Sequence, residues 1–185
     1  SRLFKVEKLV FLGSSCIYPK NCKQPIKEEY LLSGELEKTN QWYSVAKISG
    51  IKMIQAYKEQ FGCNFISLMP CNMYGPNDNY HPLNSHVLAA LIRKFVLAKK
   101  QKKNFVEIWG SGKPLREFMH VDDFAEATIF ASKKYNSSKP INVGTGEEIN
   151  IKKLALLIAR LSEFKGKIVF NKNYPDGTKR KILNS

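Results

Sequence analysis

Short apolar runs alternate with longer segments of helical periodicity, and this alternation most constrains the fold. A first run, 8–12, stops at a Gly-Ser-Ser sequence, and a second, 64–69, is broken by a proline. Between them, apolar residues recur three or four positions apart from a cap at Thr39 or Asn40 to a stop at Gly62. Strands and helices in this order predict βα units around a mainly parallel sheet.

The rest of the chain continues the pattern. It predicts a helix over 86–100, a strand over 106–109, a helix over 121–135, a strand over 140–143, a helix over 151–161 capped by Asn150, and a strand over 168–170. Residues 71–85 are rich in Pro, Gly, Asn and Asp and predict a long functional loop. The polar residues 171–185 predict no element, so we expect the chain to be cut inside a domain there.

Length and composition exclude several classes of protein. A chain of 185 residues suits one domain or a piece of a larger protein. With 43% hydrophobic and 25% charged residues it is not a disordered, collagen-like or disulfide-scaffold sequence. Because no apolar run approaches the roughly 20 residues of a membrane span and residues 1–8 lack a signal core, we expect a cytoplasmic protein without membrane contact.

The four cysteines, Cys16, Cys22, Cys63 and Cys71, lack the paired spacing of a zinc site. We therefore expect free thiols and no metal.

The net charge of +14 raises the question of a nucleic-acid partner. The lysine-rich runs 99–103 and 179–181 have no interleaved aromatic residues and no known recognition motif. Basic runs of this kind usually form solvated helix ends, so we expect no nucleic-acid partner.

Tyr43 and Lys47 lie four residues apart in the first predicted helix, so they share a face and the ammonium favours the phenolate. About one such pair is expected by chance in a chain so rich in lysine. The second pair, Tyr135 and Lys139, precedes a proline and is not expected to be helical. Tyr43 lies on the first helix after a strand that ends in Gly-Ser-Ser-Cys, and this context favours a Ser/Tyr/Lys site.

Several blocks of sequence together resemble the extended short-chain dehydrogenase/reductase family, of the NAD-dependent epimerase/dehydratase type. The blocks are 11–19 (FLGSSCIYP), 43–47 (YSVAK), 69–76 (MPCNMYGP), 81–86 (HPLNSH), 109–112 (WGSG), 116–123 (REFMHVDD) and 174–178 (YPDGT). The resemblance implies a Rossmann-like, doubly wound parallel sheet with part of a smaller C-terminal substrate lobe. The blocks at 13–16 and 81–86 point to the members that convert GDP-4-keto-6-deoxy-D-mannose to GDP-L-fucose with NADPH, by 3,5-epimerisation and 4-reduction.

The resemblance also implies catalytic roles. Ser14 would hydrogen-bond the sugar carbonyl, Tyr43 would donate a proton as hydride reaches C4, and Lys47 would hold the nicotinamide ribose and stabilise the phenolate. Cys16 and His86 would be the acid and base of the epimerisation, in an order that the sequence leaves open. Taken alone, Cys16 is better interpreted as a small buried hydrophobe. His86 alone fits a polar residue at a helix start equally well, and His81 and His120 are its rivals.

Binding residues follow from the same resemblance. The segments expected to contact NADP(H) are Leu12, Gly13, Ser14 and Ser15, then Pro70, Cys71, Asn72 and Met73, together with Lys47 and His86. The residues expected to hold the GDP-sugar are Lys94, Trp109, Arg116 and Asp176. Arg116 suits a bidentate diphosphate contact, while the adjacent Arg93 competes with Lys94 for the same role.

The chain departs from the family where a dinucleotide site needs a glycine-rich turn. Before residue 50 the sequence has only Gly13 and Gly34, and 110–112 and 144–146 lack the third glycine. We therefore expect a partial domain without the N-terminal cofactor half, inactive alone, with a catalytic portion over 1–75 and a mixed substrate lobe with returning sheet elements over 76–185. Lys179, where proline is more usual, affects only a local turn.

The family commonly dimerises through the helices that begin near residues 40 and 86, so the resemblance implies a homodimer. Three alternatives remain. They are another nucleotide-sugar epimerase or dehydratase, for which Cys16 is the discriminating residue, a basic nucleic-acid-binding module, and a non-catalytic relative.

Overall fold

The computed structural model describes residues 1–82 and 84–185. It contains two compact units. The first consists of Ser1–Met73, Glu117–Glu147 and Lys181–Ser185, and the second of Tyr74–Arg116 and Glu148–Arg180.

A parallel three-stranded sheet forms the centre of the first unit. Its strands β1 (Leu9–Leu12), β2 (Phe65–Pro70) and β7 (Ile141–Val143) lie in the order β1-β2-β7. Leu12 lies opposite Leu68, which in turn lies opposite Ile141. Every residue of β2 is buried, as expected for the middle strand of a parallel sheet covered on both faces. The parallel sheet predicted from the sequence is therefore confirmed.

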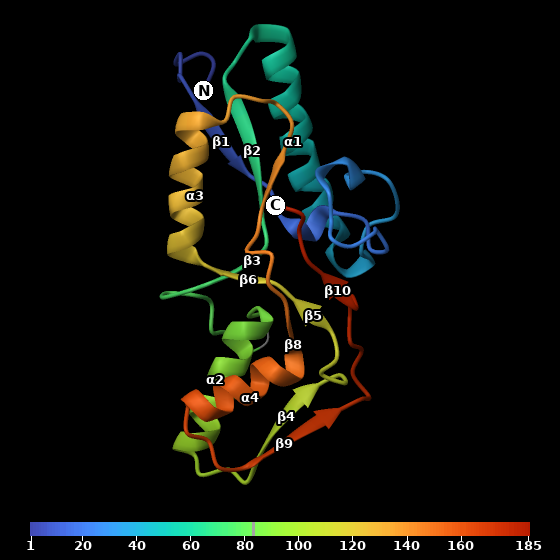
Figure 1. Cartoon of the computed structure of the whole chain (residues 1–185), viewed down its shortest axis with the longest axis vertical. Helices are drawn as coiled ribbons and strands as arrows, with labels where there is room; N and C mark the ends of the chain where they lie inside the picture. The colour runs from blue at the N-terminus through green and yellow to red at the C-terminus, as the bar shows by residue number, and fades with distance from the viewer. Residues whose placement is uncertain (83) are drawn as a thin grey trace. The chain divides into compact units, whose positions relative to one another are not determined.

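Two helices, α1 (Gln41–Phe61) and α3 (Val121–Lys134), pack on this sheet, and in Figure 1 the strands lie between them. α1 ends as predicted, because Gly62 adopts a left-handed conformation with φ of 65° and donates its N–H to the carbonyl of Lys58. A Cβ at Gly50 would collide with the ring of Phe11, so glycine lets α1 approach β1 closely. Among the helices of the described residues, none is both long and apolar enough to cross a membrane.

Short elements connect the strand ends of the first unit. The 3-10 helices η1 (Ser15–Ile17), η2 (Glu28–Tyr30) and η3 (Lys38–Asn40) lie between β1 and α1. The strand β3 (Asn72–Tyr74) pairs with β6 (Phe118–His120). β3 falls in the segment that we predicted to be entirely loop, since a three-residue strand leaves no periodicity in the sequence.

The C-terminal segment contains β10 (Arg180–Lys181) and continues into the core of the first unit. Ile182 and Leu183 are buried, and Ile26 forms an isolated parallel bridge with Leu183. The prediction that residues 171–185 form no element was wrong. The bridge joins Leu183 to Ile26, which lies far away in the sequence, so local patterns cannot reveal it.

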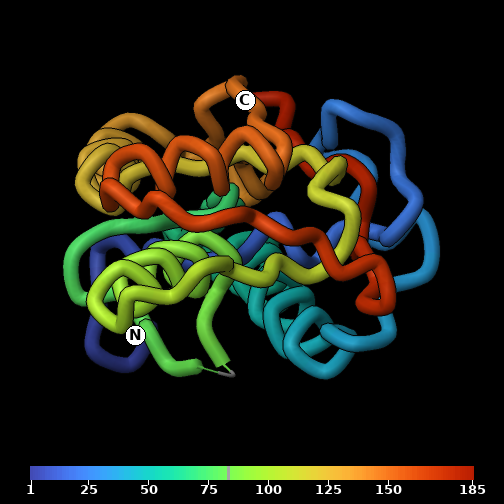
Figure 2. Tube along the Cα trace, turned by 90° about the horizontal axis from the view of Figure 1, so that it is seen from below, coloured from blue at the N-terminus to red at the C-terminus, as the bar shows by residue number. Residues whose placement is uncertain are grey.

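The second unit packs two helices and a pair of parallel strands. α2 (Val87–Lys100) contacts both α4 (Ile151–Leu161) and β4 (Phe105–Trp109). β4 runs parallel to β9 (Lys167–Asn171), and the two strands lie side by side in both views (Figures 1 and 2).

The helix α4 begins as predicted. The side chain of Asn150 caps it by accepting a hydrogen bond from the backbone N–H of Lys153 at 2.7 Å. Just before the helix, β8 (Ile149–Asn150) pairs antiparallel with β5 (Leu115–Arg116).

Candidate active site

The carboxyl end of β1 leads into a tight turn that carries two half-buried polar side chains. Gly13 donates its N–H to the carbonyl of Leu68 at 2.7 Å, and a Cβ on it would collide with the sulfur of Met69. Ser14 then caps η1, with Oγ accepting from the N–H of Cys16 at 3.1 Å. The turn thus places Ser14 and Cys16 directly beyond the strand, where α/β folds position reactive groups.

Lys47 connects α1 to this strand end. Its Nζ donates to the carbonyl of Leu12 at 2.8 Å and lies 5.7 Å from the centre of the Tyr43 ring. The ring of Tyr43 remains accessible, since 45% of the residue is exposed. The structure therefore brings the predicted tyrosine and lysine together at the end of β1. The rival pair is not helical, because Tyr135 ends α3 and its hydroxyl donates to the carbonyl of Lys139.

The backbone of Cys16 is fixed to the first turn of α1. The Ser44 hydroxyl and the Asn40 side-chain amide each donate to the Cys16 carbonyl at 3.3 Å. Asn40 precedes α1 as predicted, but its side chain holds η1 and does not cap the helix. Ser44, the residue after Tyr43, is fully buried. The sequence analysis missed it, although a small hydroxyl residue on the buried face of a helix could have indicated such a contact.

Lys181 is a second residue that sequence reasoning missed. Its Nζ lies 3.4 Å from Cys16 Sγ, with hydrogen-bond geometry. We interpreted the run 179–181 only as a solvated or phosphate-binding segment. No local signal could reveal this contact, because 165 residues separate the two side chains in the sequence.

The predicted cofactor segment 70–73 begins at the last residue of β2. Cys71 donates its N–H to the carbonyl of Val143, and the side chain of Asn72 donates to the carbonyl of Glu117 at 2.9 Å. Burial, assisted by the Glu117 carboxylate, raises the pKa of Cys71 to about 12. Cys71 is therefore a neutral, structural thiol, whereas its neighbour Met73 is exposed.

The four predicted substrate residues line one cavity of ≈240 Å³ within the second unit. The full lining comprises Val87, Leu91, Lys94, Ile108, Trp109, Gly112, Pro114, Arg116, Ile151 and Asp176. Of the adjacent cations Arg93 and Lys94, Lys94 is the one that lines it.

The polar side chains of this cavity are held in place. Lys94 Nζ donates to the carbonyl of Glu107 at 3.1 Å and lies 5.0 Å from the centre of the Trp109 ring, which stacks on Tyr174. Burial lowers the pKa of Lys94. The Asp176 carboxylate accepts from the N–H and the hydroxyl of Ser111, and these bonds lower its pKa. The result is a cavity with two cations, an indole face and a fixed carboxylate.

The three histidines occupy different surroundings. His86 is exposed and directly precedes α2, where its carbonyl accepts the N–H of Ala90 at 2.8 Å. His120 caps α3 by accepting from the N–H of Asp122, and His81 accepts from the N–H of Asn84. Within the 81–86 block, Leu83 lies outside the described residues.

The structure leaves the four cysteines as free thiols. Across residues 1–82 and 84–185, no group of three or more His, Cys, Asp or Glu side chains could hold a metal ion.

A parallel, helix-covered sheet defines a Rossmann-like α/β protein. Here a serine follows one strand, and a lysine of the adjacent helix, next to a tyrosine, hydrogen-bonds the end of that strand. A model of the NAD dependent epimerase/dehydratase family matches residues 1–151. The chain belongs to this family.

Relatives and solved structures agree with this assignment. The chain is 57% identical over 180 residues to the probable GDP-L-fucose synthase 1 of Oryza sativa subsp. japonica, covering 97% of this chain and 55% of the relative. It is 50% identical over 187 residues to the GDP-L-fucose synthase of Escherichia coli strain K12, covering 96% and 58%. A crystal structure of a GDP-L-fucose synthetase from Naegleria fowleri bound to NADP matches with a TM-score of 0.93 and 31% identity, covering 98% of this chain and 58% of that one. The chain thus spans little more than half the length of these relatives.

Proposed function

We propose that this chain contributes the catalytic and sugar-nucleotide-binding side chains of an enzyme that converts GDP-4-keto-6-deoxy-D-mannose to GDP-L-fucose with NADPH. One observation carries the proposal. Lys47, fixed by the Leu12 carbonyl, lies beside Tyr43 at the strand end from which Ser14 and the Cys16 thiol emerge. The names of the relatives at 50 to 57% identity support the same reaction.

The residues present fit the nicotinamide end of NADP(H). An ammonium, a phenol and a serine hydroxyl gather near the ends of β1 and β2, and these donors suit a ribose and the carbonyl that is reduced. The glycine-rich turn that cradles a pyrophosphate is not among the residues of this sequence. When bound, the cofactor supplies the hydride for C4. Met73 and the strand ends would border its nicotinamide.

Reduction needs a proton at the C4 oxygen, and Tyr43 is the group proposed to supply it. Ser14 would donate a hydrogen bond to the same oxygen. The Lys47 ammonium, 5.7 Å from the ring centre, stabilises the phenolate that Tyr43 leaves behind.

Epimerisation needs a base at C3 and C5, whose hydrogens the 4-keto group makes acidic. In the proposed step the Cys16 thiolate takes the proton, so that the C–H bond breaks, an S–H bond forms and the electron pair moves to the enolate oxygen. An acid then returns a proton to the opposite face of the carbon, and the family pattern gives this role to His86. The Lys181 ammonium beside Sγ favours Cys16 as the base, because a thiolate there faces a cation.

The cavity of the second unit suits a nucleotide diphosphate. The Arg116 guanidinium and the Lys94 ammonium complement the diphosphate charge, and the Trp109 ring offers an apolar face. The basic balance of the chain fits anionic ligands of this kind without a nucleic acid.

A homodimer remains part of the proposal. The α1 helix presents large apolar side chains to solvent, among them Trp42, Val45 and Met53, and these are suited to a second copy.

Product analysis tests the proposed reaction. With the chain joined to the cofactor half of a family member, NADPH consumption with GDP-4-keto-6-deoxy-D-mannose should yield GDP-L-fucose, identified by its NMR couplings at C3, C4 and C5. The Tyr43→Phe variant of the same joined protein should lose this consumption. A product reduced at C4 but with unchanged configuration at C3 and C5 would assign the protein to a different sugar-nucleotide reductase.

A further inference from the structure

The contact between Lys181 and Cys16 is the starting point. Lys181 Nζ donates to Cys16 Sγ at 3.4 Å, a normal distance for a hydrogen bond to sulfur. Both residues are half-buried, so the ammonium and the thiol are only partly screened by water. The two residues belong to the same unit of the structure.

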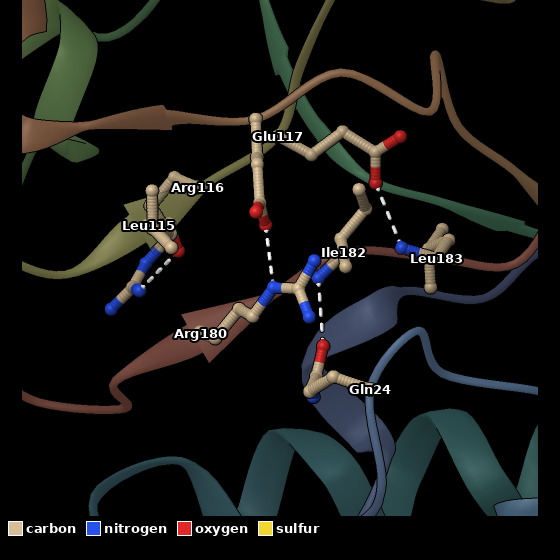
Figure 3. Close-up of polar contacts among 8 residues, drawn as sticks. Gln24, Leu115, Arg116, Glu117, Arg180, Ile182 and Leu183 are labelled. Atoms are coloured by element: carbon tan, nitrogen blue, oxygen red, sulfur yellow. Dashed lines mark hydrogen bonds and ion pairs between the residues drawn. The ribbon is translucent and has the colours of Figure 1, made fainter.

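The segment that carries Lys181 is fixed by hydrogen bonds that the two following residues make through their backbone groups. The N–H of Ile182 donates to the side chain of Gln24 at 3.0 Å, and its carbonyl accepts the N–H of Ile26 at 2.8 Å. The N–H of Leu183 donates to the carboxylate of Glu117 at 2.9 Å. Figure 3 shows the side chains of Gln24 and Glu117 reaching these two N–H groups.

Glu117 is the anchor of this arrangement. Only 1% of it is exposed, and its second carboxylate oxygen accepts the N–H of Gly146 at 2.8 Å. A buried carboxylate that bonds backbone N–H groups on two separate segments holds those segments in one register. The position of Lys181, two residues before Leu183, is therefore imposed by the core of the unit.

The partner side of the contact is equally fixed. Ser14 holds the N–H of Cys16, while Ser44 and Asn40 hold its carbonyl. The charge of Lys181 also reaches Cys22, where it opposes the rise in pKa that burial causes. The contact thus joins two backbone segments that hydrogen bonds hold in place.

We propose that Lys181 is a positioning residue for Cys16. Its ammonium holds Sγ at one place and stabilises the thiolate, so that Cys16 can accept a proton from the sugar carbon. That the proton comes from the sugar carbon rests on the proposed function. The stabilisation of a thiolate by Lys181 rests on the geometry alone. Lys181 is not among the catalytic or binding residues expected from the sequence.

Alkylation of Cys16 by iodoacetamide at pH 7, followed by peptide mass spectrometry on the whole chain, tests the proposal. Iodoacetamide is neutral, so the rate reports the thiolate and not attraction of the reagent. The Lys181→Met variant should reduce the rate about threefold, because the thiolate that reacts loses the cation facing it. Lys181→Arg should restore most of the rate, because it retains the positive charge, which a purely structural role would not require.

Two controls keep the result interpretable. Lys179→Met removes one charge from an exposed side chain of the same segment and should leave the Cys16 rate unchanged. Buried Cys71 reports folding, since it reacts only when the unit opens. If Lys181→Met exposes Cys71, Lys181→Gln replaces it in the same comparison. An unchanged Cys16 rate in folded Lys181→Met or Lys181→Gln, or a loss of rate that Lys181→Arg does not reverse, would overturn the proposal.

A parallel measurement separates this inference from the proposed function. Turnover of GDP-4-keto-6-deoxy-D-mannose is assayed on the same variants joined to the cofactor half of a family member, which supplies the glycine-rich turn. A threefold loss of alkylation, with no turnover by the joined protein that carries no substitution, would support the Lys181–Cys16 pair and count against the proposed reaction. Turnover, together with an alkylation rate of Cys16 that stays the same in Lys181→Met, would support the reaction and overturn the positioning role.

Discussion

The Nζ of Lys47 lies 2.8 Å from the carbonyl oxygen of Leu12, and this bond fixes the ammonium of α1 at the end of β1. The helix can approach that closely because Gly50 has no Cβ to strike Phe11. Because both groups belong to one packed unit, the position of the cation relative to Tyr43 is set by the core and not by the ligand.

Replacing Lys47 by methionine should therefore impair reduction more than folding. In the protein joined to the cofactor half of a family member, we expect the rate of NADPH oxidation to fall about 100-fold, within the range attributed to general acid–base catalysis. The thermal midpoint should change little. Lys52→Met, an exposed lysine on the same helix, is the matched control. Equal rates for the two variants would remove Lys47 from the site.

Gly50→Ala should destabilise the first unit. The added methyl group would meet the ring of Phe11, so we expect a loss of about 1 to 3 kcal/mol in the free energy of unfolding, measured by urea denaturation. Gly34→Ala, whose Cβ would make only an ordinary contact with Pro19, should be tolerated. Identical urea midpoints for both variants would show that α1 does not approach β1 as described.

How much of this the sequence could predict depends on the range of the interactions. The apolar runs of β1 and β2, the end of α1 at Gly62 and the cap at Asn150 are local signals, and all of them were predicted correctly, although β1 is only half-buried. The strands β3, β5, β6, β8 and β10 have two or three residues each and depend on partners far along the chain, so no periodicity revealed them.

The candidate site divides in the same way. Tyr43 and Lys47 share a helix face, which their spacing alone predicts. The positions 94, 109, 116 and 176 could be grouped only through the family resemblance, and the structure gathers them in one cavity. The contacts of Lys181 with Cys16 and of Glu117 with Leu183 needed the folded chain.

Glu117→Gln tests the anchor of the C-terminal segment. A glutamine can retain one acceptor, but its amide group would face a backbone N–H, so we expect a loss of about 1 to 3 kcal/mol in the free energy of unfolding. Amide hydrogen exchange at Leu183 should accelerate as well. The exposed Glu147→Gln is the control. Slow exchange at Leu183 in the Glu117 variant would contradict the anchoring role.

Lys94→Met should weaken nucleotide binding without lowering stability. Burial lowers the pKa of Lys94, so its charged form is less favourable in the folded than in the unfolded chain. That charge therefore opposes folding below the lowered pKa, and the penalty disappears as the pH rises toward the ordinary value of 10.5. At neutral pH the variant should be at least as stable as the parent.

The affinity for GDP, measured by calorimetry, should fall about tenfold in Lys94→Met, because a charge-assisted contact is lost. Lys100→Met, at the exposed end of α2, should change neither quantity. Unaltered GDP affinity in the Lys94 variant would remove this lysine from the diphosphate site.

Incorporation of deuterium into GDP-4-keto-6-deoxy-D-mannose in D₂O tests the central claim most directly, because proton exchange at C3 and C5 requires the base but no hydride. The protein should introduce deuterium at both carbons, the Cys16→Ala variant should reduce the rate at least 100-fold, and Cys22→Ala should leave it close to the parent. Full exchange at C3 and C5 in the Cys16→Ala variant would contradict the account.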